Sequence, residues 1–268
     1  HGANAELWSM VHVQDPTTAN ARLFVQLWDD VRSRCGHARG VVAQRLDWFE
    51  QYAPWMDEVR NHPQETPLLL HGARVELATG TGMSPLERFL IAIAGRAIKG
   101  FTVISPYFDA RGHVLTALLH AHPKASVDVI VEDEWGSIPN ELPGSDQRQC
   151  KFYRWAELHQ GDAGSSAFKN GRLHAKLLVA HVKDGSEVIL LGSSNASLAG
   201  MGGVGEAAMN EEVNLLLDRP RSNVLGELGI TLRGTSPLRL DQLRKGVSTE
   251  PSTGGRSHRP IRLMHAEY

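Results

Sequence analysis

The chain has 268 residues, of which 41% are hydrophobic, so it can bury a large core. Its formal net charge is −2, so it lacks the excess of basic residues that is typical of proteins that bind nucleic acid over a wide surface. No apolar run approaches the roughly 20 residues that cross a bilayer, and residues 1–10 do not resemble a signal peptide. The two cysteines form neither a CxxC pair nor a zinc spacing, so a reducing, cytoplasmic setting and no metal are expected.

The hydrophobic pattern predicts strands that alternate with helices over most of the chain. In chain order we expect a strand at 5–13, helices at 17–35 and 40–60, a strand at 68–78, a helix at 84–100, a strand at 101–105, a helix at 113–122, strands at 126–132, 150–155, 172–182, 187–192 and 212–218, and a helix at 221–230. This order predicts an α/β fold with a mixed, largely parallel sheet flanked by helices.

A histidine and a lysine interrupt the apolar strand predicted at 172–182. Residues two apart in a strand share a face, so His174 and Lys176 are expected to point the same way. Burying an unpaired ammonium is costly, which argues against a structural role for Lys176. The pair suits phosphoryl transfer, because Lys176 can neutralise a phosphate oxygen while His174, with an ordinary pKa of about 6.5, attacks or protonates at phosphorus.

Small and polar residues follow the next predicted strand, where Gly192 precedes Ser193, Ser194 and Asn195. Such residues let backbone and hydroxyl donors approach an anion closely, so we expect the two serines to bind substrate and Asn195 to bond a phosphate oxygen. Tyr107 follows the strand predicted at 101–105, where ligand loops of α/β sheets lie, and either stacks on a base or packs.

In this order, the motifs resemble those of the phospholipase D superfamily, also called the His-Lys-Asp family. The matching residues are His174 and Lys176, then Gly192 to Asn195, then Asn210 and Glu212 ahead of another apolar strand. The resemblance covers residues 85–229, with one departure at His181, where the family commonly has aspartate. It implies catalysis without a metal or other cofactor: one histidine attacks phosphorus, a second protonates the leaving oxygen, and Glu212 accepts the remaining ring N–H of a catalytic histidine.

The sequence contains no second H-x-K that is followed by an apolar strand and Gly-Ser-x-Asn, although members of the family typically work with two such motifs facing each other. Asn4 and Glu6 repeat the spacing of Asn210 and Glu212, and both residues are offset by 206 positions. Each pair precedes an apolar strand, which is followed by Asp, Pro and a helix. We interpret Asn4 and Glu6 as part of a first half-site whose H-x-K lies upstream, since the sequence has no initiator methionine. The alternative is a homodimer in which each chain gives one His174.

The expected domains are the end of a first phospholipase D-like lobe (1–34), a helical connector (35–80), a second lobe with the H-x-K motif (81–232) and a partly linker-like C-terminal extension (233–268). The resemblance implies a metal-independent phosphodiesterase, namely a nuclease that cleaves DNA or RNA through a phosphohistidine, with a bacterial restriction or phage-defence role as a hypothesis. The alternatives are a soluble phospholipase D that acts on phospholipid head groups and an inactive lobe that binds nucleic acid or a protein partner.

Overall fold

The computed structural model describes residues 4–7, 21–61, 68–70, 72–80, 82–132, 134–158 and 172–243. Eight strands form the main sheet: β2 (Leu68–Leu70), β3 (Ala73–Thr79), β4 (Ile98–Ser105), β5 (Ser126–Val131), β6 (Cys150–Arg154), β8 (Leu177–Val182), β9 (Glu187–Gly192) and β10 (Val213–Arg219). Their order across the sheet is β2-β3-β10-β9-β8-β4-β5-β6. Two further strands, β1 (Asn4–Ala5) and β7 (Arg172–Leu173), form a small parallel sheet of their own.

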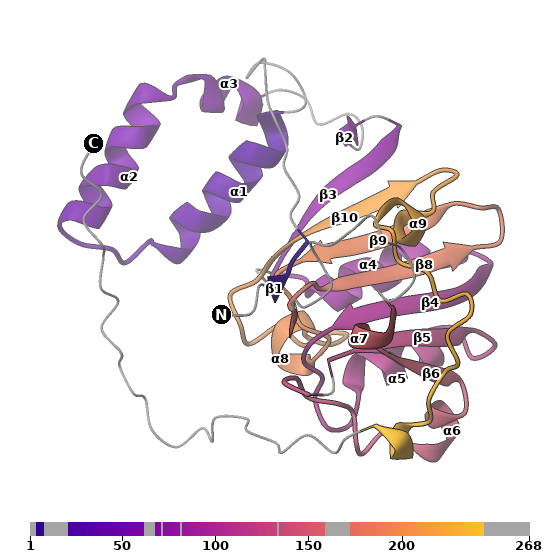
Figure 1. Ribbon diagram of the computed structural model, residues 1–268. Coiled ribbons are helices and arrows are strands. Elements are labelled where there is room, and N and C mark those ends of the chain that lie inside the picture. The colour runs from indigo at the N-terminus through magenta and orange to yellow at the C-terminus, as the bar shows by residue number, and fades with distance from the viewer. Residues whose placement is uncertain are drawn as a thin grey trace.

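Helices lie beside the main sheet and on both of its faces (Figure 1). They are α1 (Ala21–Arg34), α2 (Val41–Tyr52), α3 (Trp55–Asn61), α4 (Pro85–Ile93), α5 (His113–Ala121), the one-turn helices α6 (Gly144–Gln147), α7 (Trp155–Leu158), α8 (Leu198–Met201) and α9 (Val224–Glu227), and the 3-10 helix η1 (Leu240–Gln242). Helix α4 begins as its Ser-Pro sequence predicts, since the Ser84 hydroxyl accepts a hydrogen bond from the Glu87 amide and Pro85 occupies the first turn.

The main sheet is buried on both faces, and β8 shows how its side chains divide between them. Leu178 and Ala180 join the core cluster that includes side chains of α4 and α5. Leu177 and Val179 join a second cluster with side chains of α7 and α9. This alternation follows from the two-residue period of a strand, and it explains why β8 reads as a continuous apolar run.

The predicted α/β class and mixed sheet are confirmed, but the share of parallel pairs is lower than the sequence pattern suggested. In the eight-stranded sheet, β4-β5 and β5-β6 pair in parallel, and the other five neighbouring pairs are antiparallel. Antiparallel neighbours need only a tight turn, as at Gly185 between β8 and β9, where φ is 86°. Parallel neighbours need a crossover, which α5 supplies between β4 and β5.

Several predicted elements have different bounds in the structure. The strand expected at 68–78 is a hairpin that turns at Gly72 (φ 79°), so the main sheet begins before residue 81. The helix expected at 40–60 is divided into α2 and α3 at Pro54, since proline disfavours a helical residue before it. The helix expected at 84–100 ends at Ile93 and Ile98 already begins β4. The strand predicted beyond Leu7 and the extension beyond Leu243 lie outside the described residues.

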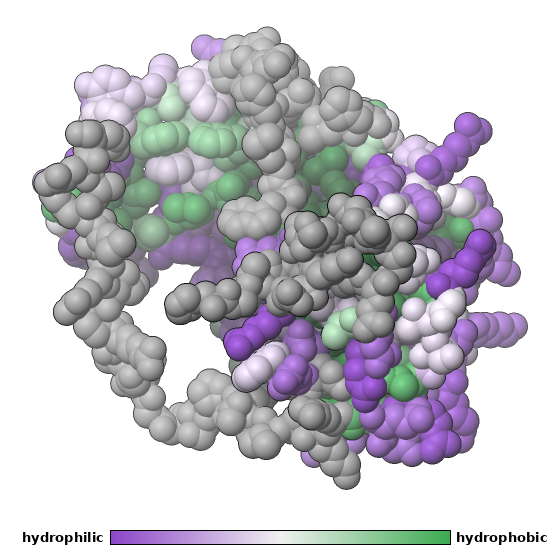
Figure 2. All heavy atoms as spheres, viewed as in Figure 1, coloured by the Kyte–Doolittle hydropathy of each residue, from purple (hydrophilic) through white to green (hydrophobic). Residues whose placement is uncertain are grey.

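Helices α1 and α2 carry exposed apolar side chains, and apolar residues are visible in this region in Figure 2. The large exposed side chains are Phe24, Val31, Val41, Val42, Trp48 and Tyr52. In the part of the chain that the structure describes, no helix combines the length and apolar character needed to span a membrane.

Candidate active site

The predicted reacting residues come together at one edge of the main sheet. Leu177 at the start of β8 pairs with Leu191 near the end of β9, and Gly192 pairs with Asn214 in β10. Ile104 pairs with Leu177, so β4 ends at the same edge. The segments that flank these strand ends carry His174, Lys176, Asn195 and Glu212.

His174 contacts a carboxylate from the other end of the chain. Its Nδ1 lies 3.1 Å from Oε1 of Glu6, because β1 pairs in parallel with β7 and places Ala5 opposite Leu173. The His174 side chain is 48% exposed. A carboxylate at Nδ1 favours the tautomer with its proton on that nitrogen, which leaves a lone pair on Nε2.

The structure corrects the expected position of His174 and Lys176, which do not lie within a strand. Strand pairing ends at Leu173 and resumes at Leu177, so both residues belong to the connection between β7 and β8. The physical reason is that β7 pairs with β1 outside the main sheet, and the chain must cross to the main sheet over residues 174–176. The two side chains therefore differ in exposure: Lys176 is buried, whereas His174 is half-exposed.

Lys176 is held directly beside the histidine, since its Nζ donates a hydrogen bond of 2.6 Å to the His174 carbonyl oxygen. Burial lowers the pKa of Lys176, while the nearby carboxylates Glu212 and Glu6 act in the opposite direction. The lysine therefore places a cation near two carboxylates and against the backbone of His174.

Asn195 has a buried side-chain oxygen with no hydrogen-bond partner among the described residues. Buried polar atoms in folded proteins are nearly always paired, so this oxygen is free to accept a hydrogen bond from a donor of a ligand, whereas a phosphate oxygen would have to bond the amide nitrogen. Ser193 next to it is exposed, and its hydroxyl accepts a hydrogen bond of 2.9 Å from the Val213 amide. Gly192 permits this pairing, because a Cβ there would lie 2.3 Å from the Val213 carbonyl oxygen.

Ser194 points into the protein rather than toward the site opening. It is 1% exposed, its hydroxyl donates to the Gly200 carbonyl oxygen (3.0 Å), and it accepts from Nδ2 of Asn214 (2.8 Å). Asn214 also accepts from the Ser194 amide (3.2 Å) and donates to the Ala78 carbonyl oxygen (3.1 Å). The sequence reasoning did not single out Asn214, although a lone amide in the apolar run of β10 was a signal for a buried network.

Glu212 is buried at the same edge, and Nδ2 of Asn210 lies 3.3 Å from its Oε1. In the described part of the chain, the carboxylate that contacts His174 is Glu6 and not Glu212. The backbone of Asn4 pairs with Arg172 across the small sheet. Glu6 therefore lies at the half-site that this chain contains, closer to His174 than the sequence repeat suggested.

Tyr107 lies at the same edge, after β4, and its side chain is 44% exposed. The Ser105 hydroxyl donates to the Tyr107 carbonyl oxygen (2.8 Å) and accepts from the Ala196 amide (3.0 Å). The segment that carries Tyr107 is thus joined to the segment that follows Asn195.

His181, the one departure from the motifs that the sequence resembles, lies at the far end of β8 from His174. Its Nε2 is 2.9 Å from the Thr102 hydroxyl and its Nδ1 is 3.0 Å from Oε1 of Glu187. Oε2 of Glu187 accepts from the Val224 amide (2.9 Å). His181 therefore links β4, β8 and β9 and takes no part in the site at His174.

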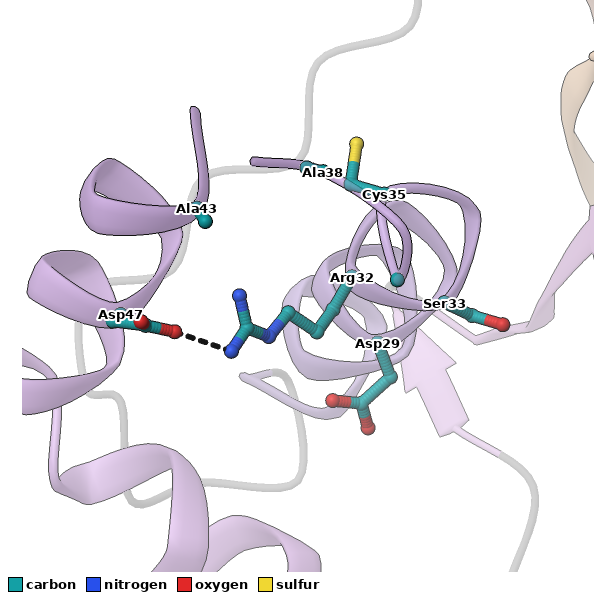
Figure 3. A pocket seen from close by; sticks show the side chains of 8 residues that line it. Asp29, Arg32, Ser33, Cys35, Ala38, Ala43 and Asp47 are labelled. Carbon is teal, nitrogen blue, oxygen red and sulfur yellow. Dashed lines mark hydrogen bonds and ion pairs between the residues drawn. The ribbon is translucent and has the colours of Figure 1, made fainter. Parts of the chain in front are cut away.

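Two other observations bear on ligands. Within the described ranges, no three His, Cys, Asp or Glu side chains are grouped so as to hold a metal ion. A hollow of about 550 Å³ lies between α1 and α2, where Arg32 pairs with Asp47 (Figure 3). Its lining residues all come from 29–47, so it is separate from the residues around His174.

Solved structures with related folds were found, although no family model and no curated protein matches the sequence. Nuc of Salmonella typhimurium, a phospholipase D family member, is 14% identical over 59% of this chain and 90% of its own, with a TM-score of 0.39. NucT of Helicobacter pylori is 16% identical over 59% of this chain and 92% of its own, with a TM-score of 0.36.

A mutant of yeast tyrosyl-DNA phosphodiesterase is 14% identical over 55% of this chain and only 31% of its own, with a TM-score of 0.33. Identities and TM-scores this low carry no conclusion about the activity of this chain.

Proposed function

We propose that this chain supplies a half-site of a metal-independent phosphodiesterase in which His174 is the nucleophile. The observation that carries the proposal is the contact between Glu6 and Nδ1 of a half-exposed His174, whose backbone carbonyl oxygen accepts a hydrogen bond from the Lys176 ammonium. A histidine fixed in this tautomer presents the Nε2 lone pair outward, and the lysine offsets the charge of an approaching phosphodiester.

The proposed reaction has two steps. Nε2 of His174 attacks phosphorus, an N–P bond forms, and the bond to one alcohol oxygen breaks as that oxygen takes a proton from a second acid. Water then attacks the phosphohistidine, loses its proton to the same group, and the N–P bond breaks. Lys176 and the Asn195 amide would donate hydrogen bonds to the non-bridging oxygens in both steps.

The second acid is proposed to be a histidine of another H-x-K half-site. Glu6 and Glu212 are equivalent in the sequence repeat, and Glu6 contacts His174. By the same symmetry, the buried Glu212 would accept the Nδ1 proton of the second histidine. That histidine would come from an upstream lobe of which residues 1–34 are the end, or from a second copy of the chain. The repeat favours the upstream lobe.

The proposed substrate is nucleic acid, with cleavage of DNA or RNA as the activity and restriction or phage defence as the hypothetical biological role. What supports nucleic acid is the motif resemblance together with exposed Tyr107 and Arg172 at the same sheet edge as His174. Cleavage of phospholipid head groups, or binding without cleavage, would each give a different outcome in the test below.

The test uses the full-length protein in EDTA, with labelled single- and double-stranded DNA, RNA and phosphatidylcholine, beside a His174→Ala variant. Cleavage of nucleic acid in EDTA that disappears in the variant is the expected result. After a brief reaction, the protein is run on a denaturing gel. A protein–phosphate adduct that is sensitive to acid and stable to base identifies the phosphohistidine. Activity that requires added Mg²⁺, or that survives in His174→Ala, contradicts the mechanism, and cleavage of phosphatidylcholine alone would support the phospholipase.

A further inference from the structure

A second group of exposed side chains lies beside His174, and the reaction proposed above does not use it. The indole of Trp135 is 55% exposed, and the guanidinium carbon of Arg172 lies 4.0 Å from the centre of its ring. Arg172 is itself exposed and precedes His174 by two residues. A large exposed aromatic ring covered on one face by a guanidinium leaves its other face available to a flat ligand.

The loop that carries Trp135 is fixed to the strand that leads to His174. Oε2 of Glu132 accepts a hydrogen bond from the Leu173 amide (3.0 Å), and Oε1 of the same carboxylate accepts from the Glu134 amide (3.4 Å). Glu132 therefore fixes both the residue before Trp135 and the residue before His174. The backbone next to Trp135 is thereby joined to the backbone next to the proposed nucleophile.

The same loop is also fixed to the segment that carries Tyr107. The Ser137 hydroxyl donates to the Phe108 carbonyl oxygen (2.7 Å), and the Ser137 amide donates to the Pro106 carbonyl oxygen (3.0 Å). Gly136 allows this contact, since a Cβ there would lie 2.0 Å from the Pro106 carbonyl oxygen. Two hydrogen-bonded loops thus present two exposed rings, Trp135 and Tyr107, at the edge that holds the reacting residues.

We propose that Trp135, supported by Arg172, is a stacking platform for an unpaired nucleobase next to the phosphate that His174 attacks, with Tyr107 as a second ring along the strand. The inference rests on the proposed function, because it assigns the substrate class of that site. Bases in a duplex already stack on each other, whereas every unpaired base offers a free face to an aromatic ring. Single-stranded DNA or RNA is therefore the substrate that fits.

Trp135 and Arg172 should differ in how their contributions to binding depend on salt. Arg172 can contact a phosphate as well as the indole, but Glu134 next to Trp135 opposes an accumulation of positive charge. The effect of removing the indole should therefore be insensitive to salt, whereas the effect of Arg172→Gln should decrease as salt rises.

The test measures kcat/KM of the full-length protein for three oligomers of about 12 nucleotides. They are an oligothymidylate, an oligouridylate and an abasic oligomer with tetrahydrofuran in place of each nucleoside. In Trp135→Ala, the preference for the base-containing oligomers over the abasic one should fall by about 5- to 100-fold, which is the effect of losing one stacked base. Trp135→Phe should restore most of it. The matched control is Trp48→Ala, which removes a similarly exposed indole on α2.

Equilibrium binding separates failure of this inference from failure of the proposed chemistry. Anisotropy of labelled oligothymidylate is measured in a His174→Ala background with and without Trp135→Ala. Weaker binding on loss of the indole supports the platform even if no substrate is cleaved. His174-dependent cleavage with an unchanged base preference in Trp135→Ala overturns the platform and leaves the nuclease intact. Absence of any binding to single strands overturns the platform as well.

Discussion

Oε1 of Glu6 lies 3.1 Å from Nδ1 of His174, so the candidate nucleophile is oriented by a side chain from the other end of the described chain. The contact depends on one pair of two-residue strands, β1 and β7. The proposed task of the Glu6 carboxylate is to select the tautomer of His174 and to stabilise the positive charge that the ring gains when Nε2 bonds to phosphorus.

Glu6→Gln should lower kcat by about 10²- to 10⁴-fold with a smaller change in KM, because the amide can no longer stabilise the positive charge of the phosphorylated imidazole or select the tautomer of His174. Steady-state kinetics on the full-length protein with single-stranded DNA measures both constants. Glu58→Gln, which changes an exposed carboxylate on α3, is the control and should retain activity. An unchanged kcat in Glu6→Gln would show that the contact has no catalytic role.

Lys176 should limit activity at alkaline pH, and this limit should lie below the pH at which an ordinary exposed lysine loses its proton. Burial lowers its pKa, so it loses its proton, and with it the positive charge proposed to bind phosphate, at a pH where an exposed lysine is still charged. In Lys176→Arg the side chain stays charged throughout this range, so the alkaline limb of kcat/KM should move to higher pH. The pH profiles of both proteins test this, and coincident alkaline limbs would contradict it.

The buried network around Asn214 should matter for stability. Asn214→Ala leaves the Ser194 amide and the Ala78 carbonyl oxygen without their partners, so the free energy of unfolding should fall by about 1–3 kcal/mol. Urea unfolding followed by circular dichroism gives this value. Asn140→Ala, at an exposed position, should change it by less than about 0.5 kcal/mol. Equal losses in the two variants would rule out a special role for the network.

Glu187 should make stability depend on acid pH. Burial alone would raise its pKa, but hydrogen bonds from His181 and the Val224 amide reverse this, and the net shift is below the usual 4.5. A lowered pKa in the folded state stabilises the fold above the unfolded pKa, and this stabilisation is lost as pH falls through the lowered folded value.

The measurement for Glu187 is a pair of urea titrations, at pH 7 and at pH 3, on the parent and on Glu187→Gln. The difference in free energy of unfolding between the two proteins should be largest at pH 7 and should shrink at pH 3, where the parent carboxyl begins to take up a proton. A difference that is the same at both pH values would mean that the ionised carboxylate contributes nothing specific.

Much of the fold followed from local patterns in the sequence. The hairpin of β8 and β9 has two apolar runs around Asp-Gly, and α4 begins at Ser-Pro; both are local signals, because turns and helix caps depend on residues close together in the chain. The balance of parallel and antiparallel pairs did not follow, since it depends on which distant strands become neighbours.

The candidate site was also predictable only where local patterns mark it. His174, Lys176, Asn195 and Glu212 were singled out from their spacing. The contact between Glu6 and His174 needs a pairing of β1 with β7 that no local pattern encodes. The burial of Ser194 likewise depends on Asn214, which comes from the neighbouring strand. Trp135 was missed because a single aromatic in a loop has no periodicity to mark it.

The hairpin that separates Lys176 from Asn195 has its turn at the far edge of the sheet. Residues 183–186 close the turn there, while the strand ends that hold the candidate site lie at the other edge. The length of this turn can therefore change without moving the residues of the candidate site. For protein engineering, the same turn is a natural point for inserting a tag or a fluorescent label.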